Sequence, residues 1–420
     1  MNKIYGFFCL FFLLLCVSFK AEASTLDPFG RVIINNSIDL DKAIIEFNNN
    51  TLPIGVSNPV TFIFMKDIHH GDGNSYPVIK AGITSNKTTL IIDGNFHRYT
   101  YGKVGSTGVQ GEPGSSTPGT TVRLREFEFD SNTDFTLKNM NIGLAKDKND
   151  FGQADPSLLN YVNGNIEDAT ESKFAFLFST GKNNIDLHFS TVNFIAGKNG
   201  KFVDLSTNGF NNTLSFSGVN NILYPPKITM TAHNALIQGP PDWTIEDGTT
   251  NFVSDIDQNR DAIFYLEPQH NSPNYNQSRI LVERDAVFNL TVNRNEDAAL
   301  YDGNSNFDSV VWDILGEMNF RTPSPGRSSY EALHFEAADI KNFAIDLGES
   351  AKFTSSGYII FDLFNGIDRT FQLNCSQDSY LDWYKQKSSH TNDDGRLFLG
   401  NPRNSFLGSL QSTIIIKNAR

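Results

Sequence analysis

The sequence predicts an all-β chain that folds as a right-handed parallel β-helix with a short N-terminal capping helix. The main observation is a recurring unit in which a short alternating strand, a turn residue and a second short strand follow one another. From residue 185 onward, successive units start 29, 29, 37, 31 and 32 residues apart, at Ile185, Leu214, Trp243, Ile280, Val311 and Phe343. A period of roughly thirty residues in a strand-rich chain indicates a stacked solenoid.

A further short strand precedes most of these units, so each repeat supplies three strands. These additional strands are expected at 127–129, 174–178, 202–205, 228–230, 263–266 and 333–335. Three strands per coil, advancing by one strand spacing per turn, is the geometry of a right-handed parallel β-helix. Phenylalanine, with 35 copies, often occupies inward-type positions, which predicts aromatic ladders in the core. Asparagine and glycine near the end of each first strand suit the left-handed backbone of tight corners.

The chain begins with a predicted signal peptide at residues 1–23. Lys3 supplies the positive end, residues 7–17 form an apolar run, and residues 21–23 (Ala-Glu-Ala) offer a cleavage site. An uncleaved anchor is the alternative, but the apolar run of eleven residues is short for spanning a bilayer. We therefore expect a secreted chain that starts at residue 24.

One helix is predicted after the signal peptide, starting at Ser37, whose side-chain oxygen can cap free amides. Apolar residues follow at helical spacing, at Ile38, Leu40, Ala43, Ile44 and Phe47. An amphipathic helix here would cover the first open edge of the solenoid, which would otherwise template aggregation. The strands are expected to begin after the helix, at 61–68.

The mature chain divides into a β-helix domain at 24–375, which includes the N-terminal cap, and an irregular C-terminal cap at 376–420. Three long loops interrupt the repeats, at 101–121, 146–171 and 267–277. Long loops on a rigid scaffold often carry recognition. Simple tolerance to insertion is the alternative for these three loops.

The charge of the chain excludes one class of partner. The full chain has a net charge of −13. Without Lys3, Lys20 and Glu22 of the signal peptide, the 34 basic and 47 acidic residues become 32 and 46, a net charge of −14. An acidic surface without basic clusters repels phosphate backbones, so we expect no nucleic-acid partner. The mature chain also has no apolar stretch long enough to predict a transmembrane segment.

The cysteines point to the cellular compartment. Cys9 and Cys16 lie in the signal peptide, which leaves Cys375 without a partner for an intramolecular disulfide. A secreted chain without disulfides favours a bacterium with a single membrane. We find no sorting motif for covalent wall attachment and expect an extracellular protein, or one loosely associated with the cell wall. The role of Cys375 and the oligomeric state stay open.

The ordered series of units resembles the pectate-lyase-like adhesive domains of Gram-positive bacterial surface proteins. The segments that carry the resemblance are 61–68, 90–98, 135–142, 192–194, 214–218 and 345–353, within residues 33–375. Their order carries the resemblance, because no single motif among them is specific. The resemblance implies a pectate-lyase-like solenoid that serves attachment or cell-envelope interaction.

Two groups of residues are candidates for polysaccharide cleavage. A lyase on this fold needs acidic oxygens around calcium and an arginine or lysine base. Arg321 and Arg327 resemble the Arg-x-Pro-x-x-Arg strip of pectate lyases, but the second arginine comes one residue late. Residues 312–314 (Trp-Asp-Ile) also lack the histidine of a companion element. A proline-stiffened surface turn explains residues 321–327 better. A glycoside hydrolase on this fold would need clustered carboxylates. The acidic pair at 393–395 is the candidate for these, but a solvated turn explains it better.

Two segments are candidates for metal sites. Residues 255–261 place oxygens at alternating positions, but Arg260 stands where a calcium loop needs glycine and Leu266 where it needs glutamate. At 69–72 (His-His-Gly-Asp), two adjacent histidines would diverge on a strand, which favours a polar loop. His188, inside an apolar strand, is expected to be a buried core residue. We therefore predict no catalytic residue, no cofactor site and no metal site.

The function predicted from the sequence is that of a secreted cell-surface protein with a non-catalytic pectate-lyase-like β-helix. The expected role is adhesion or cell-envelope binding, and the expected partner is an unknown glycan, host matrix or cell-wall ligand. Two alternatives stay open. One is a divergent polysaccharide lyase or glycoside hydrolase, and the other is a passive structural spacer.

Overall fold

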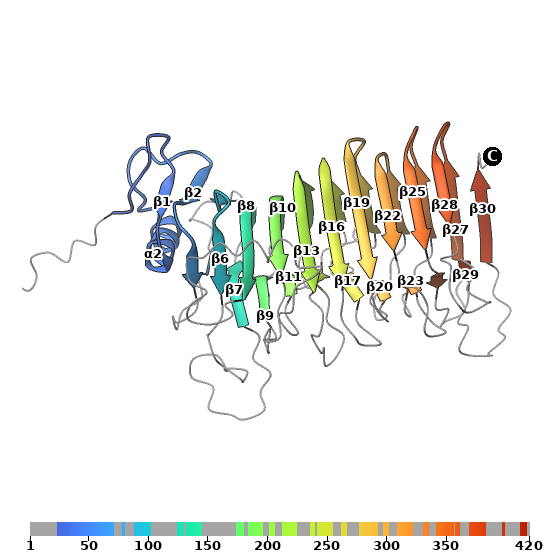
Figure 1. Ribbon diagram of the computed structural model, residues 1–420, viewed down its shortest axis with the longest axis horizontal. Coiled ribbons are helices and arrows are strands. Elements are labelled where there is room, and N and C mark those ends of the chain that lie inside the picture. Colours follow the sequence, from blue (N-terminus) through green and yellow to red (C-terminus); the bar gives the residue numbers. More distant parts are fainter. Residues whose placement is uncertain are drawn as a thin grey trace, which may run out of the picture.

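In the computed structural model, parallel strands stack coil upon coil along one axis (Figure 1). The structure describes residues 23–70, 78–79, 88–101, 124–129, 132–144, 174–179, 184–195, 201–205, 212–224, 236–239, 242–254, 262–266, 277–292, 297–301, 309–321, 331–335, 342–356, 358–361, 369–383, 397–399 and 412–417. These residues form an all-β parallel solenoid with one helix, α2 (Ser37–Asn48). The predicted signal peptide up to residue 22 and most of the three predicted long loops lie outside the described residues.

Each complete coil contributes one strand to each of three faces, as the sequence predicts. The first face contains β1 (Val32–Ile34), β2 (Val60–Phe64), β5 (Thr88–Asp93), the first parts of β8 (Thr133–Leu144) and β10 (Ile185–Ile195), β12 (Thr213–Ser217), β15 (Asp242–Ile245), β18 (Gln277–Val282), β21 (Ser309–Ile314), β24 (Asn342–Leu347), β27 (Arg369–Cys375) and β30 (Ser412–Lys417).

The second face follows the first after a tight turn in each coil. It contains β3 (Ile68–His70), β6 (Arg98–Tyr101), the second parts of β8 and β10, β13 (Val219–Tyr224), β16 (Gly248–Ser254), β19 (Ala286–Val292), β22 (Glu317–Arg321), β25 (Lys352–Ser356) and β28 (Tyr380–Trp383). In Figure 1 the later strands of this face, from β13 to β28, lie side by side along the solenoid.

The third face is a separate sheet of ten strands. It contains β4 (Val78–Ile79), β7 (Leu124–Phe129), β9 (Phe174–Ser179), β11 (Lys201–Leu205), β14 (Ile237–Gly239), β17 (Ala262–Leu266), β20 (Asp297–Tyr301), β23 (Glu331–Phe335), β26 (Tyr358–Phe361) and β29 (Leu397–Leu399). The strand predicted at 228–230 lies outside the described residues, and the described third-face strand of that coil is β14.

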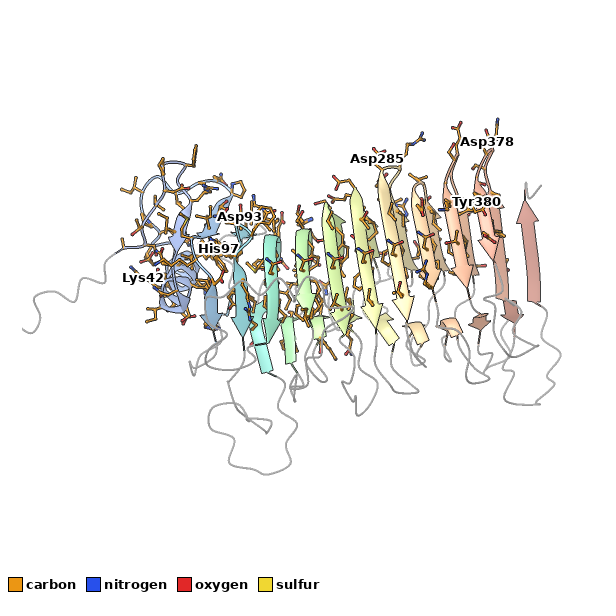
Figure 2. All side chains as sticks on the ribbon, in the orientation of Figure 1. Lys42, Asp93, His97, Asp285, Asp378 and Tyr380 are labelled. Atoms are coloured by element: carbon orange, nitrogen blue, oxygen red, sulfur yellow. The ribbon has the colours of Figure 1, made fainter. Side chains whose placement is uncertain are left out.

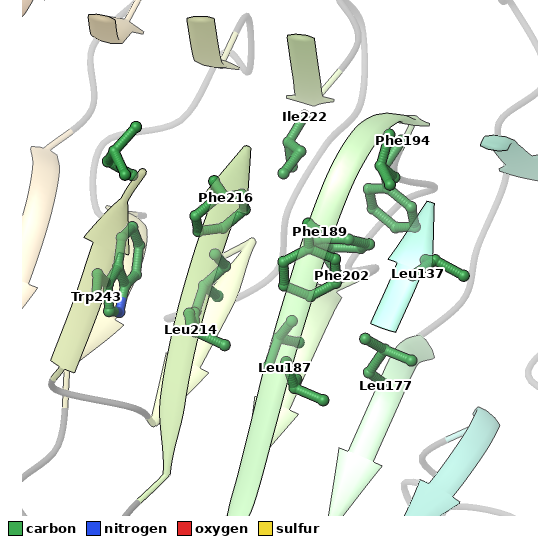
Figure 3. Packing of buried hydrophobic residues seen from close by; sticks show 14 of the residues in the cluster. Leu137, Leu177, Leu187, Phe189, Phe194, Phe202, Leu214, Phe216, Ile222 and Trp243 are labelled. Atoms are coloured by element: carbon green, nitrogen blue, oxygen red, sulfur yellow. The ribbon is translucent and has the colours of Figure 1, made fainter. Parts of the chain in front are cut away.

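The core is a continuous apolar column in which equivalent residues of successive coils stack. Along the first face, Leu187, Leu214 and Trp243 occupy one register row and are almost fully buried. Aromatic rings bridge the faces: the centroids of Phe189 and Phe202 are 4.7 Å apart. Figure 3 shows these two rings side by side in the core. The predicted phenylalanine ladders are therefore confirmed as core packing.

The tight turn between the first and second faces repeats from coil to coil. In three coils the predicted left-handed corner is confirmed by a positive φ, at Asn139 (51°), Gly218 (67°) and Gly248 (65°), whereas the predicted corners Gly316 and Gly348 do not have a positive φ. The turns stack, because the amide of Thr249 donates to the carbonyl oxygen of Gly218 at 2.8 Å. A Cβ built on Gly248 would lie 2.1 Å from that oxygen, so this position requires glycine. Asp378 (φ 57°), labelled in Figure 2, marks the same turn in a later coil.

The N-terminal cap differs from the prediction in two respects. The strands begin at β1, before the helix, because Val32–Ile34 pairs with Phe62–Phe64. The helix N-cap is Asn36, whose side chain accepts from the amide of Asp39, and not Ser37. The predicted apolar face is otherwise confirmed: Leu40, Ala43, Ile44 and Phe47 are buried against the end of the column, while Ile38 is 75% exposed.

The strand pattern continues beyond residue 375, where a separate cap was predicted. The strands β28, β29 and β30 pair in parallel with β25, β26 and β27. The pairing of the described strands therefore places no boundary between 24–375 and 376–420.

No helix in the described part of the chain is long and apolar enough to span a membrane.

Candidate functional site

The residues considered for lyase chemistry are not gathered at one place among the described residues. Arg321 ends β22 on the second face and is exposed, whereas Trp312 is fully buried in the core. Arg327, the segment 255–261 and the acidic pair at 393–395 lie outside the described residues. Within the described residues, no group of three or more His, Cys, Asp or Glu side chains is placed to hold a metal ion.

His70 belongs to a buried ionic cluster, so the polar loop predicted for it is wrong. It lies in β3 and is 7% exposed. Its Nδ1 lies 2.6 Å from Glu126 Oε1 of β7, and its Nε2 lies 3.2 Å from Asp41 Oδ1 of α2. The hydroxyl of Tyr99, in β6, donates to the same Glu126 oxygen. The cluster thus joins the capping helix to the second and third faces.

The charge on this cluster follows from burial and ion pairing. Desolvation lowers the pKa of His70, but the charge of Glu126 and the hydrogen bonds to Asp41 and Glu126 outweigh it and raise the pKa to about 10. His70 is therefore a cation at neutral pH. Burial, together with the charge of Glu126, raises the pKa of Tyr99 well above its ordinary value, so Tyr99 remains a neutral donor.

His188 corrects a second prediction, because it points outward and not into the core. Its side chain is 38% exposed, and its Nε2 lies 3.1 Å from Asp134 Oδ1 of the preceding coil. Its Nδ1 lies 2.7 Å from Ser215 Oγ of the following coil. The residues on either side, Leu187 and Phe189, are the ones that enter the core.

The outward side of the first face carries charge along much of its length. Asp134, Asp186, Asp242 and Arg279 lie in one register path across the coils. The guanidinium of Arg279 donates to Asp313 Oδ2 at 2.6 Å, and its backbone amide donates to Asp242 Oδ1 at 2.9 Å. Desolvation raises the pKa of Asp242, and the amide and charge of Arg279 oppose that rise. The charged residues of this face are mostly acidic and stand among uncharged ones.

The outward side of the second face carries a ladder of asparagine side chains. The ladder residues are Asn141, Asn193, Asn221, Asn251, Asn289 and Asn319, one from each of six successive coils. From Asn193 onward, each Nδ2 donates to the Oδ1 of the preceding asparagine at 2.7 to 2.9 Å. Thr354 continues the ladder by donating to Asn319. The residues that flank each asparagine in sequence are buried, so the amides face outward.

Three coils of this ladder form an uncharged surface, which we call the uncharged block. It comprises the nine outward side chains of β13, β16 and β19, namely Val219, Asn221, Leu223, Thr249, Asn251, Val253, Val287, Asn289 and Thr291. The block ends at β22, where the outward residues beside Asn319 are Glu317 and Arg321. In a chain of net charge −13, nine neighbouring surface positions without an ionisable group are a distinct feature.

Sequence reasoning did not single out this ladder, although its signal is present. In three coils the ladder asparagine stands between two apolar residues of a second-face strand, as Met140-Asn141-Ile142, Val192-Asn193-Phe194 and Met318-Asn319-Phe320. Recurrence of one polar residue at one repeat position predicts a row on one face. The hydrogen bonds between the amides depend on register, which the structure supplies.

Comparisons with known proteins give two structural likenesses. No protein-family model matches the chain, and no curated protein matches it. A solved structure of the L. reuteri 53608 SRRP (serine-rich repeat protein) is similar with a TM-score of 0.46 and 12% identity, over 92% of this chain and 99% of that chain. The L. reuteri 100-23 SRRP is similar with a TM-score of 0.46 and 10% identity, over 91% of this chain and 98% of that chain.

Proposed function

We propose that this chain is a secreted, non-catalytic right-handed parallel β-helix of the pectate-lyase-like kind that binds a ligand at a bacterial surface. The observation that carries the proposal is the uncharged block on the second face. Its strands hold neighbouring side chains in fixed register, and a rigid surface loses little conformational freedom on binding. The expected ligand is a glycan, a host matrix component or a cell-wall component.

The chemistry of the block favours binding over catalysis. Its side chains are amides, threonine hydroxyls and aliphatic groups, such as Asn251, Thr249 and Val253. None of these groups takes up or releases a proton near neutral pH, as a general acid or base must. They can donate and accept hydrogen bonds and pack against apolar surface, which suits recognition.

Retention of the mature protein on surfaces tests the proposal. Residues 24–420 would be labelled and added to Gram-positive cells, isolated cell walls, and plates coated with mucin or matrix protein. We expect saturable retention on at least one of these surfaces. Absence of retention on all of them would contradict the proposal and would favour a passive spacer.

A parallel assay addresses the enzymatic alternative. The same protein would be incubated with uronide polymers and calcium while the ultraviolet absorbance of unsaturated products is followed. We expect no increase over buffer. A sustained increase that depends on protein concentration would replace the binding proposal by a polysaccharide lyase.

A further inference from the structure

We infer that the uncharged block binds an uncharged, extended polysaccharide that lies along the solenoid axis, across β13, β16 and β19. The inference rests on the proposed binding function and assigns its site and its ligand class. The ligand is thus defined by three properties of the block: unused hydrogen-bonding groups, their spacing, and the absence of charge.

The ladder amides have hydrogen-bonding capacity that the protein does not use. An asparagine side chain carries two N–H donors and two acceptor positions on its oxygen. Asn221, Asn251 and Asn289 each use one N–H toward the preceding coil and one acceptor position toward the following coil. Within the described part of the chain, the second N–H and second acceptor position of each of these amides have no protein partner. At Asn319, by contrast, the second N–H donates to Glu317 at 2.8 Å.

The spacing of the amides matches a ligand with a short, regular repeat. Neighbouring strands in a sheet lie about 4.8 Å apart, so the ladder offers a donor and an acceptor at this interval along the axis. An extended polysaccharide presents hydroxyl groups at a similar interval, once per sugar ring. The hydrogen bonds between Asn221, Asn251 and Asn289 already fix the amide orientations, so a ligand need not order them.

The rows beside the ladder suit the less polar parts of a sugar. On one side lie Val219 and Val287, of which Val219 is 51% exposed, and on the other side lie Leu223 and Val253. Sugar rings expose C–H groups on their faces, and packing these against aliphatic side chains removes both from water. Hydroxyl groups along the same chain can then reach the amides between the two rows.

The charges around the block select against an acidic polymer. The block itself contains no cation. Each of the two arginines that border it, Arg321 in β22 and Arg284 in the turn before β19, stands near a carboxylate in the sequence, Glu317 or Asp285, and the turn before β16 adds Asp247. An acidic polysaccharide lying on the block would find no cation within it and would approach the carboxylates beside it, which lowers its affinity. The uncharged class therefore fits better than a uronide or a sulfated chain.

Binding of defined oligosaccharides to matched variants tests the inference. Mature protein would be titrated calorimetrically with N-acetylchitohexaose, cellohexaose and mannohexaose as uncharged probes, and with hexagalacturonate as the acidic comparison. Uncharged and acidic fractions of cell-wall polysaccharide and of mucin glycans would form two further arms, which separate a bacterial from a host source. We expect at least one uncharged probe or fraction to bind, with an affinity that changes little with salt.

The variants separate a binding role from a structural one. Asn251→Ala breaks two ladder hydrogen bonds inside the block, and Asn141→Ala breaks two hydrogen bonds outside it, to Asn193 of the ladder and to the carbonyl oxygen of Phe96. Thr249→Glu places a charge in the block and leaves the ladder intact. We expect Asn251→Ala and Thr249→Glu to weaken binding by about tenfold or more, an effect of one lost hydrogen bond or one buried charge. Asn141→Ala should bind as the unchanged protein does.

The outcomes distinguish this inference from the proposed function. Retention on surfaces with no loss in Asn251→Ala and Thr249→Glu would overturn the inference and leave the binding function standing. Binding of hexagalacturonate or of acidic fractions alone would also overturn it. Equal loss of binding in Asn251→Ala and Asn141→Ala would overturn the inference, because it would show that the ladder acts only on stability, which thermal unfolding of both variants would confirm. Absence of retention on every surface would overturn both.

Discussion

The stacked turn at Gly248 gives a stability prediction that can be worked out from the structure. Gly248 has a φ of +65°, a conformation that costs an alanine about 1–2 kcal/mol. An added Cβ would also lie 2.1 Å from the oxygen and 2.7 Å from the carbonyl carbon of Gly218. Relieving such a contact against backbone costs about 1–3 kcal/mol. We therefore expect Gly248→Ala to lower the free energy of unfolding by about 3 kcal/mol.

Two other glycines separate the contributions. Gly55 has a φ of +93°, but an added Cβ there meets no described atom within 4 Å, so Gly55→Ala should cost only the conformational part, about 1 kcal/mol. Gly143 has neither a positive φ nor a described atom within 4 Å of an added Cβ. Gly143→Ala should be close to neutral or slightly stabilising, because glycine weakens a strand.

Urea denaturation followed by tryptophan fluorescence measures these changes, since Trp243 and Trp312 are both buried in the core. Gly248→Ala should lower the free energy of unfolding most, Gly55→Ala less and Gly143→Ala least. The slope of the free energy of unfolding against urea concentration should be the same in all three variants. A difference of less than about 0.5 kcal/mol between the free energies of unfolding of Gly248→Ala and Gly143→Ala is typical of neutral surface changes. Such a result would show that the turns do not stack as described.

Three further predictions concern ionisable groups. Raising the pH from 7 to 10 should lower the Tm, because stabilisation by protonated His70 is complete below its unfolded pKa of about 6.5 and is lost as the pH rises through its folded pKa of about 10. In circular dichroism melts, His70→Gln should reduce the fall of the Tm with pH, and an unchanged fall would count against the cluster. Burial raises the pKa of the Cys375 thiol, so Ellman's reagent should label it quickly only in denaturant, and rapid labelling of the folded protein would show that it is accessible. Asp313→Asn should lower the free energy of unfolding by at most about 1 kcal/mol, less at high salt, because Arg279 is 54% exposed; a larger, salt-independent loss in urea titrations would contradict a surface ion pair.

The repeat architecture could be predicted because local signals recur at one period. In the coil that contains Gly218, alternating apolar residues, a turn residue and a second alternating run all agree, and the structure places β12 and β13 there. Most third-face strands could be predicted as well, since alternation placed strands where the structure has β9, β11 and β17. The strand expected at 228–230 lies outside the described residues, and β14, the described third-face strand of that coil, was not predicted.

The positions of individual polar residues could be predicted less well. His188 lies between Leu187 and Phe189, so alternation alone would have placed it outward, and its apolar surroundings in sequence were misleading. His70 could not be placed from local sequence, because its partner Glu126 is 56 residues away on another face. The asparagine ladder likewise depends on register between coils, which sequence alternation leaves undetermined.

Side-chain amide NMR of the mature protein, titrated with the uncharged hexasaccharides, tests binding at the second face most directly. The Nδ2–H signals of Asn221, Asn251 and Asn289 should shift and saturate together at one ligand stoichiometry. The signal of Asn374, whose Nδ2 donates to Asp346 on the first face, should stay in place. Shifts confined to Asn374 and its neighbours, or no shift of the three ladder amides at any concentration, would contradict a binding site on the uncharged block.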